Sequence, residues 1–469
     1  MIKPATPVIA IIGGGFCGTM AAVHLLAQKD TPLNIIMVNS GYPISRGVAY
    51  SSYSHKHLLN VPAKNMSAFP DKPTHFIDWI KKHENYSVID QMTLPGMFLP
   101  RNVYGNYLKE VFENAMKKRP ENISVTFIHD EAIDIEIKNN KAVIYFSVSP
   151  AEIADKVLLA TGNEAPENPP MDDTSFYSSS NYYHNPWLHE AVNHCDINKN
   201  VLIIGNGLTM VDIVIGLKEK NHSGKIYSLS PNGFQILPHR IHEPYKALME
   251  ELHPPYDLVS LVGIFRKHVH SLREQGVTGE AAVDSLRPLT QKIWMLLSYK
   301  EKKRFMYHLR HLWGVARHRL PMALHQQIQQ FILDDKLEII AGRIQSIRED
   351  ERGIHVSMKR RRNQSIYEIN VARVINCTGP QTDVSKMRRP LMKNLVSRNL
   401  IAPDEMRLGM NATPEGIILN EQGNKSNHLY TIGGNLKGIL WESTAVPELR
   451  GQAKNIVELM LKENLVNNT

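Results

Sequence analysis

Cysteine is scarce in this chain of 469 residues, which contains only Cys17, Cys195 and Cys377. The three cysteines are far apart, and no C-x-x-C pair occurs. The sequence therefore predicts no disulfide framework, no structural zinc site and no redox-active dithiol. We expect a protein without a bound metal ion, in a reducing cytoplasm.

Long hydrophobic runs are also missing. No stretch of about 18 uninterrupted apolar residues occurs, so we expect no membrane span. The apolar residues after Lys3 resemble a signal peptide, but glycines interrupt them and an amphipathic segment follows. With 42% hydrophobic and 21% charged residues the composition is typical of globular proteins, and the length suggests two or three domains.

The formal charge of +8 is spread along the chain and favours anionic ligands only weakly. The densest basic run, at 359–362, has the sequence KRRR and lies between the alternating segments GIHVSM and SIYEINVA. This pattern predicts a solvated hairpin turn rather than a contact with nucleic acid.

A dinucleotide-binding signature is present near the start. The apolar run 9–12 predicts a buried parallel strand, and Gly13, Gly15 and Gly18 follow it with the spacing G-x-G-x-x-G. An amphipathic helix and a second apolar strand at 33–38 complete a βαβ unit. We therefore predict that the helix N-terminus binds the pyrophosphate of a dinucleotide.

Three residues near this signature need separate interpretation. Asn39 stands where an acid usually binds the ribose, and an amide forms a weaker bond, so we expect modest retention of the dinucleotide. Cys17 is interpreted as a small filler, although a helix N-terminus can also make a thiol reactive. Arg46, in the loop that follows, either reaches the pyrophosphate or is solvated.

A second signature, VLIIGNGLTMVD at 201–212, repeats the strand and the turn with Gly205 and Gly207 but has Met210 at the third position. The next strand ends in SLSPN (228–232), which has neither an arginine for a 2′-phosphate nor an acid for a ribose. The nearest arginine along the chain is Arg240. We therefore expect a weak nicotinamide site with a slight preference between NADH and NADPH.

Two later strands end in a tripeptide with Thr-Gly at its end, Ala-Thr-Gly in KVLLATGN (156–163) and Cys-Thr-Gly in RVINCTGP (373–380). In two-dinucleotide flavoproteins such a tripeptide closes the first nucleotide-binding sheet. Near the C-terminus a strand ends in Gly433 and Gly434, where such proteins usually carry Gly-Asp against the ribityl phosphate of the flavin. A helix follows, with Ser443 and Thr444 as candidate caps.

These motifs resemble a known family. They are GGGFCG, SRGVAYS, HLLNVPAKNMSAFP, FLPRNVYGNYL, LLATGN, VLIIGNGLTMVD, RHRLP and WESTAVPELR. Over nearly the whole chain the sequence resembles the bacterial FAD/NAD(P)-binding proteins that include urate hydroxylase and the nitrosuccinate-forming aspartate N-monooxygenase. More distantly, it is similar to the flavin N-hydroxylating monooxygenases. The resemblance implies bound FAD, NAD(P)H as reductant and an oxygenating reaction.

The expected fold class is α/β, with two dinucleotide-binding (Rossmann-like) domains and a helical insertion. The FAD-binding domain is expected at 1–165 and 370–469, the NAD(P)-binding domain at 185–240 and 331–369, and the insertion at 241–330. The expected cofactor-binding residues are Gly13, Gly15, Phe16, Cys17, Gly18, Asn39, Arg46, Asn60, Arg101, Thr161, Gly162, Gly205, Gly207, Gly433 and Gly434.

Two functions remain open from the sequence. An FAD-dependent, NAD(P)H-driven monooxygenase would hydroxylate nitrogen or carbon of a small polar metabolite, and no catalytic side chain is identifiable because the cofactor carries the chemistry. Alternatively, a nucleotide-sensing or assembly protein would hold FAD without turnover. The insertion's run HLRHLWGVARHRLP (308–321) either faces an anionic substrate or forms a basic helical face with ordinary hydrogen bonds.

Overall fold

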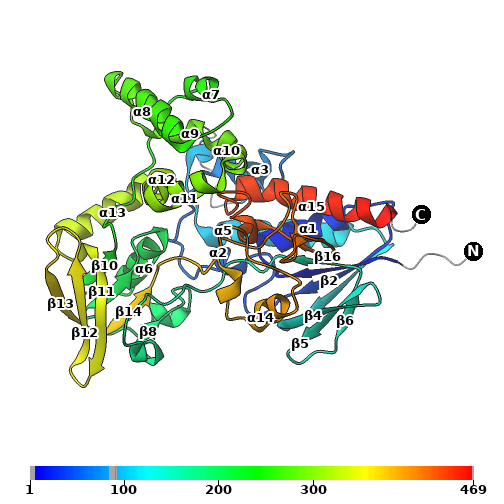
Figure 1. Ribbon diagram of the computed structural model, residues 1–469, viewed down its shortest axis with the longest axis horizontal. Coiled ribbons are helices and arrows are strands. Elements are labelled where there is room, and N and C mark those ends of the chain that lie inside the picture. Colours follow the sequence, from blue (N-terminus) through cyan, green and yellow to red (C-terminus); the bar gives the residue numbers. More distant parts are fainter. Residues whose placement is uncertain (1–5, 84–89, 91, 467–469) are drawn as a thin grey trace, which may run out of the picture. The chain divides into compact units, whose positions relative to one another are not determined.

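A computed structural model describes residues 6–83, 90 and 92–466. The chain divides into two compact units: residues 1–163, 289–302 and 382–469 form the first, and 164–288 and 303–381 form the second. Each unit contains a mainly parallel sheet with associated helices (Figure 1). This arrangement confirms the predicted α/β class with two Rossmann-like cores.

The first unit is built on a sheet with the strand order β15-β16-β7-β1-β2-β3, in which only β15 is antiparallel to its neighbour. The strands are β1 (Val8–Ile12), β2 (Leu33–Val38), β3 (Ile123–Ile128), β7 (Lys156–Leu159), β15 (Ile417–Leu419) and β16 (Lys425–Thr431). Helix α1 (Phe16–Leu26) joins β1 to β2. These three elements form the βαβ unit predicted from the glycine signature.

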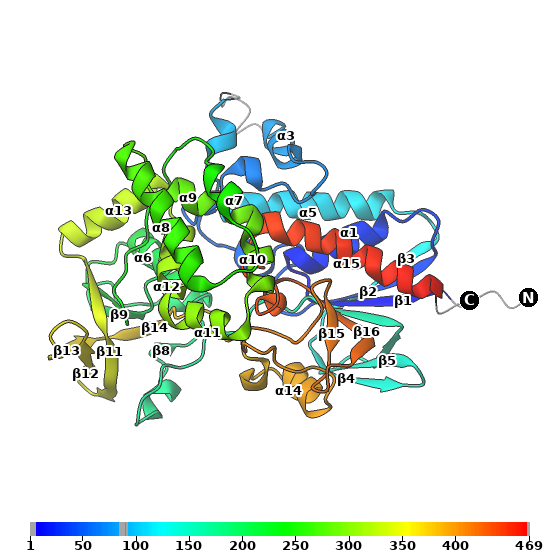
Figure 2. The same ribbon diagram turned by 45° about the horizontal axis from the view of Figure 1, so that its top comes forward.

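Both faces of this sheet are covered (Figure 2). Helices α1, α5 (Arg101–Lys118) and α15 (Val446–Val466) cover one face, where Ile9 and Ile11 join their core. The small antiparallel sheet β4-β5-β6 and helix α14 cover the other, where Ala10 and Ile12 are buried. The elements of this second layer are β4 (Ala132–Lys138), β5 (Lys141–Phe146), β6 (Glu152–Ala154) and α14 (Pro390–Ser397). The first unit also contains the short helices α2 (Gly47–Tyr50) and α3 (His75–Lys81). Burial on both faces explains why the sequence of strand β1 is continuously apolar.

The second unit has the strand order β13-β12-β11-β10-β9-β14-β8. The elements are β8 (Tyr182–Tyr183), β9 (Val201–Ile204), α6 (Leu208–Glu219), β10 (Ile226–Ser230), β11 (Leu337–Asp350), β12 (Gly353–Arg360), β13 (Ile366–Val371) and β14 (Arg373–Asn376). Strands β8 to β11 and β14 are parallel, whereas β12 and β13 form an antiparallel hairpin next to β11. The hairpin confirms the turn predicted at the basic run.

Between β10 and β11 the described chain forms helices, as predicted for the insertion. They are α7 (Ala247–Glu251), α8 (Leu258–Glu274), α9 (Glu280–Ser285), α10 (Thr290–Leu296), α11 (Tyr299–His308), α12 (Arg310–Arg317) and α13 (Met322–Leu333). Residues 289–302 cluster with the first unit, where the Trp294 ring of α10 stacks on Trp441 with 4.8 Å between centroids. None of the helices in the described ranges is long and apolar enough to cross a membrane.

Candidate cofactor sites

The first glycine turn lies at the carboxyl edge of the first sheet. Gly13 follows β1 with a φ of 113°, and a Cβ there would lie 2.2 Å from the carbonyl oxygen of Ala160. A Cβ at Gly18 would lie 1.9 Å from the Gly13 oxygen. At Gly15, however, the nearest atom would be the Cα of Gly47 at 3.8 Å. Gly13 and Gly18 therefore serve the packing of the turn, and Gly15 leaves room for a ligand.

Helix α1 starts directly after this turn. Within the described residues no side chain caps it, and its first turn has no acidic residue. The backbone N–H groups of Phe16, Cys17 and Gly18 therefore offer a site for an anion at the positive end of the helix. Burial raises the pKa of the Cys17 thiol to about 12, so the thiol is protonated at neutral pH. The interpretation of Cys17 as an unreactive filler fits this pKa.

The segment 45–47 folds over the glycine turn. The backbone N–H of Ser45 donates to the Gly14 oxygen at 2.8 Å, and the buried Ser45 hydroxyl has no hydrogen-bond partner among the described residues. Arg46 donates from Nη2 to Oδ1 of Asn106 at 2.6 Å. The Ser45 hydroxyl is thus an unused polar group beside the anion site. The only sequence signal for it was its place before Arg46 in SRGVAYS.

Asn39 lies at the end of β2, as expected, but its amide is engaged within the chain. The backbone N–H of Gly14 donates to Oδ1 at 3.0 Å, and Nδ2 donates to the Tyr42 oxygen at 2.6 Å. Asn39 therefore braces the glycine turn. A carbonyl oxygen has two lone pairs, so Oδ1 keeps one for a ribose hydroxyl.

Two loop motifs from the sequence, which contain Asn60 and Arg101, lie side by side in the first unit. The backbone N–H of Leu59 donates to the Leu99 oxygen at 2.8 Å, and that of Arg101 donates to the His57 oxygen at 2.9 Å. Arg101 is the first residue of helix α5, and its Nε donates to the Leu58 oxygen at 3.2 Å. The structure therefore brings the segments that contain Asn60 and Arg101 together, although about 40 residues separate these two residues in the sequence.

The turns after β7 and β16 lie at the same edge of the first sheet. Asn435 donates from Nδ2 to Oγ1 of Thr161 at 3.2 Å, and Gly162 has a φ of 68°. A Cβ at Gly433 would lie 3.0 Å from the Cys17 sulfur. These contacts place Thr161, Gly162, Gly433 and the adjoining Gly434 beside the first glycine turn, where parallel strands end and ligands bind.

The predicted cap at Ser443 is wrong. Helix α15 begins at Val446, and the Ser443 hydroxyl instead donates to the Gly433 oxygen at 2.8 Å. The Gln452 side chain donates to the same hydroxyl at 2.7 Å and accepts from the Gly433 N–H at 3.1 Å. Ser443 and Gln452 therefore hold the Gly433 turn against α15 from both sides.

The second glycine turn has the same construction in the second unit. Gly205 has a φ of 111°, and a Cβ there would lie 2.3 Å from the Cys377 carbonyl oxygen. A Cβ at Gly207 would meet no described atom within 4 Å, and no described side chain caps α6. Met210, at the third position of the signature, is buried. This turn also combines a packed first glycine with an open second one.

The strand that follows the second turn ends beside an arginine that the sequence pattern did not reveal. Arg240, the nearest along the chain, donates from Nη1 to Oε1 of Glu280 at 2.9 Å. Arg361, in the β12–β13 turn, donates from Nη1 to Oδ1 of Asn232. These two residues are 129 positions apart, so only the three-dimensional path of the hairpin reveals their contact.

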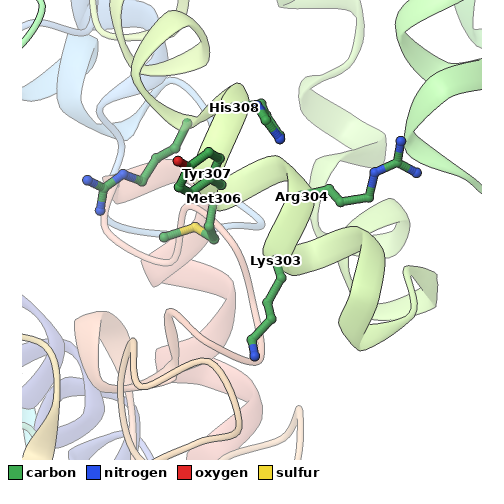
Figure 3. A pocket seen from close by; sticks show the side chains of 6 residues that line it. Lys303, Arg304, Met306, Tyr307 and His308 are labelled. Carbon is green, nitrogen blue, oxygen red and sulfur yellow. The ribbon is translucent and has the colours of Figure 1, made fainter.

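The basic run of the insertion divides into two environments. Arg319 is buried and forms an ion pair with Asp284, which also bonds His242 Nε2 at 3.0 Å. Burial alone would raise the pKa of Asp284, but Arg319, together with His242 and Arg317, outweighs this effect and lowers it. His308 and Arg310 line an open hollow of about 600 Å³ (Figure 3). Its other lining residues are Lys303, Arg304, Met306 and Tyr307. Among the described residues, no group of three or more His, Cys, Asp or Glu side chains could hold a metal ion.

The two glycine turns on parallel sheets define a fold of the two-dinucleotide flavoprotein class. Residues 10–164 match the sequence model of a family described as FAD-NAD(P)-binding, which agrees with the dinucleotide predicted for the first turn. No curated protein sequence matches the chain.

Solved structures share the fold along the chain. The reduced ornithine hydroxylase of Pseudomonas aeruginosa is similar with a TM-score of 0.65 and 13% identity, over 98% of this chain and 100% of that one. The ornithine N-hydroxylase of Kutzneria sp. 744 gives 0.62 and 13%, over 98% and 100%. The bacillithiol disulfide reductase of Staphylococcus aureus gives 0.55 and 14%, over 97% and 98%. These likenesses confirm the predicted fold class.

Proposed function

We propose that the protein is an FAD-dependent, NAD(P)H-driven monooxygenase that hydroxylates nitrogen or carbon of a small polar metabolite. The observation that carries this proposal is the presence of two glycine turns of the same construction on two separate, mainly parallel sheets, each followed by a helix whose N-terminus no described side chain caps. One turn suits a flavin dinucleotide and the other its reductant. A protein that only stored FAD would have no use for the second turn.

The residues at the first turn fit FAD. The open position at Gly15 and the α1 N-terminus receive the pyrophosphate, and the free Ser45 hydroxyl is a further donor beside it. Thr161, Gly433 and Gly434 lie at the same edge for the rest of the cofactor. Bound FAD supplies electron transfer from the nicotinamide and activation of oxygen. The protein residues bind, orient and exclude water.

The thiols of the chain favour an oxygenase over a disulfide reductase. All three cysteines are free. Burial raises the pKa of the thiols of Cys17, Cys195 and Cys377, so none is a thiolate at neutral pH. Such thiols are poor nucleophiles toward a disulfide substrate. The protonated thiols therefore disfavour a disulfide reductase activity, although the chain shares its fold with the bacillithiol disulfide reductase.

The substrate class rests on the resemblance and on the similar structures. The Kutzneria structure is described with reduced FAD, NADP⁺ and L-ornithine, and the Pseudomonas protein is an ornithine hydroxylase. The sequence motifs also resemble those of the family that includes urate hydroxylase and aspartate N-monooxygenase. A small, polar, nitrogen-containing metabolite is common to these proteins, and we propose this class for the present chain.

Flavin reduction and reoxidation test the proposal. The purified protein should be yellow, should bleach with NADPH or NADH under nitrogen, and should recover its colour in air. A metabolite screen that measures hydrogen peroxide would then identify the substrate. Reduced flavin releases hydrogen peroxide when oxygen is consumed without hydroxylation, and a productive substrate lowers this release. A yellow protein that neither nucleotide bleaches would instead be an FAD-holding sensor or assembly protein.

A further inference from the structure

The turn between β12 and β13 contains Arg361, to which the proposed function assigns no role. Strand β10 pairs with β11 as far as Ser230 and Ala341, where β10 ends. Strand β11 continues and pairs with β12, with Gly342 opposite Arg360. The residues directly after Arg360 therefore lie at the carboxyl end of β10. In a dinucleotide-binding unit this end of the second strand faces the adenosine ribose.

Arg361 is held at this place by hydrogen bonds to two segments outside its own turn. Its backbone N–H donates to the Ala341 oxygen at 2.9 Å, and its Nη1 donates to Oδ1 of Asn232. The loop after β10 packs closely on the same point, since a Cβ at Gly233 would lie 2.8 Å from the Ala341 Cβ. The guanidinium group of Arg361 therefore lies against the segment that follows the second strand of the unit.

The charge of Arg361 is available to a ligand. Arg361 is exposed, its bonded partner Asn232 is neutral, and no described carboxylate forms an ion pair with it. Its neighbour Arg360 differs, because Arg360 donates to Oε1 of Glu338 at 3.2 Å and lies 3.9 Å above the Tyr367 ring. Arg360 is thus part of the sheet, whereas Arg361 presents an unneutralised guanidinium.

We propose that Arg361, oriented by Asn232, binds the 2′-phosphate of NADPH and makes NADPH the preferred reductant. A guanidinium group forms paired, charge-assisted hydrogen bonds with phosphate oxygens, and NADH lacks this phosphate. The inference rests on the proposed role of the second glycine turn as the nicotinamide site. The sequence led to the expectation of only a slight preference between NADH and NADPH, because residues next to the second strand along the chain include no arginine. A preference for NADPH through Arg361 is proposed in place of that expectation.

Anaerobic flavin reduction by each nucleotide measures the preference in the holoenzyme. We expect wild-type protein to prefer NADPH at least tenfold in kcat/KM, and Arg361→Ala to lose about tenfold or more of this preference through NADPH alone. Arg361→Lys should keep part of it. Arg352→Ala is the matched control, because it removes the same charge from the β11–β12 turn at the other end of β12. An unchanged ratio in Arg361→Ala would overturn the proposal.

A binding measurement separates this proposal from the proposed function. Adenosine 2′,5′-bisphosphate and 5′-AMP differ only in the 2′-phosphate, and calorimetry needs no turnover. Wild type should bind the bisphosphate at least tenfold more tightly, and Arg361→Ala should bind both alike. If the flavin resists reduction but this difference holds, the reductase function fails and the phosphate site stands. If both nucleotides reduce the flavin and the bisphosphate has no advantage, the phosphate site fails and the function stands.

Discussion

The two glycine turns agree at their first two positions and differ at the third. Gly13 and Gly205 have φ angles of 113° and 111°, and a Cβ at either position would lie 2.2 or 2.3 Å from a carbonyl oxygen that follows a neighbouring strand. At the third position, however, the first turn has Gly18, where a Cβ would overlap the backbone of Gly13, and the second has the buried side chain of Met210. The turn itself therefore does not require the third glycine.

The difference assigns separate roles to the three positions. The first glycine supplies a backbone conformation that other residues rarely adopt, and the second leaves space at the helix N-terminus. The third sets how closely the helix approaches the turn, because a Cβ at Gly18 would be 1.9 Å from the Gly13 oxygen. Under the proposed function, the first turn would hold the resident FAD and the second would accept the exchanging nicotinamide nucleotide.

Exchanging the third residue should have the largest effect. Gly18→Met forces a side chain against the Gly13 oxygen, so α1 must move away from β1. We expect the purified variant to lack FAD and to lose about 3 kcal/mol of unfolding free energy, since overpacking has costs of this order. Flavin absorbance and urea unfolding measure both quantities. Met210→Leu, a volume-conserving control, should cost less than about 1.5 kcal/mol and keep the flavin. Wild-type flavin content in Gly18→Met would refute the packing role of Gly18.

The second position should separate the two cofactors. Cβ atoms at Gly15 and Gly207 have no described atom closer than 3.8 Å, so Gly15→Ala and Gly207→Ala should fold normally. We expect Gly15→Ala to weaken FAD binding about tenfold, or about 1.4 kcal/mol, and Gly207→Ala to raise the KM for NADPH by a similar factor. FAD titration of the apoproteins and steady-state kinetics measure these effects. If both variants impaired the same cofactor, the assignment of one turn to each would be wrong.

The sequence predicted the repeated strand–turn–helix units because all their parts are local. The apolar runs before Gly13 and Gly205 are buried on both faces of a sheet, and that burial appears directly as continuous apolar sequence. Hairpin β12–β13 was also predictable, since alternation and turn composition are local signals. The helical insertion followed from its periodicity.

The side-chain partners were beyond the sequence because they depend on distant segments. Asn39 has the position expected of a ribose ligand, but its bonds to Gly14 and Tyr42 arise from the folded loop. Ser443 has the residue type of a helix cap and instead bonds the Gly433 turn. Arg361 reaches Asn232 only because β11 extends beyond β10 and returns through β12.

Asn39 stands where an acid usually binds the ribose, so its replacement tests whether the internal bonds of its amide matter more than a charged ribose contact. An acid here was expected from the sequence to strengthen FAD binding, but Asn39→Asp loses the donor to the Tyr42 oxygen. We expect the free energy of FAD binding to become less favourable by about 1 kcal/mol, which is typical of one hydrogen bond and corresponds to about fivefold weaker binding. Asn34→Asp is the matched control, because Asn34 is on the same strand and its side chain accepts from Ser124 Oγ and donates to no described residue. Tighter FAD binding by Asn39→Asp would mean that a charge-assisted ribose contact outweighs the lost bond.

The smallest effect concerns the thiols at the two turns, Cys17 and Cys377. Burial raises the pKa of both, that of Cys17 from 9.0 to about 12. The folded state therefore keeps each proton at a pH where the unfolded state has lost it. The contribution to stability is complete below pH 9 and decreases as pH rises toward the folded pKa.

At pH 9.5 each thiol should thus lower the unfolding free energy by about 0.8 kcal/mol relative to pH 7. Cys17→Ser and Cys377→Ser should each remove this share of the decline, whatever constant change in stability the serine itself causes. Urea unfolding at both pH values measures the slope. At this pH the decline depends on the unfolded pKa alone, so the two variants should flatten the profile equally. A profile that remains as steep in Cys17→Ser would mean that its thiol ionises as readily in the folded turn as in the unfolded chain.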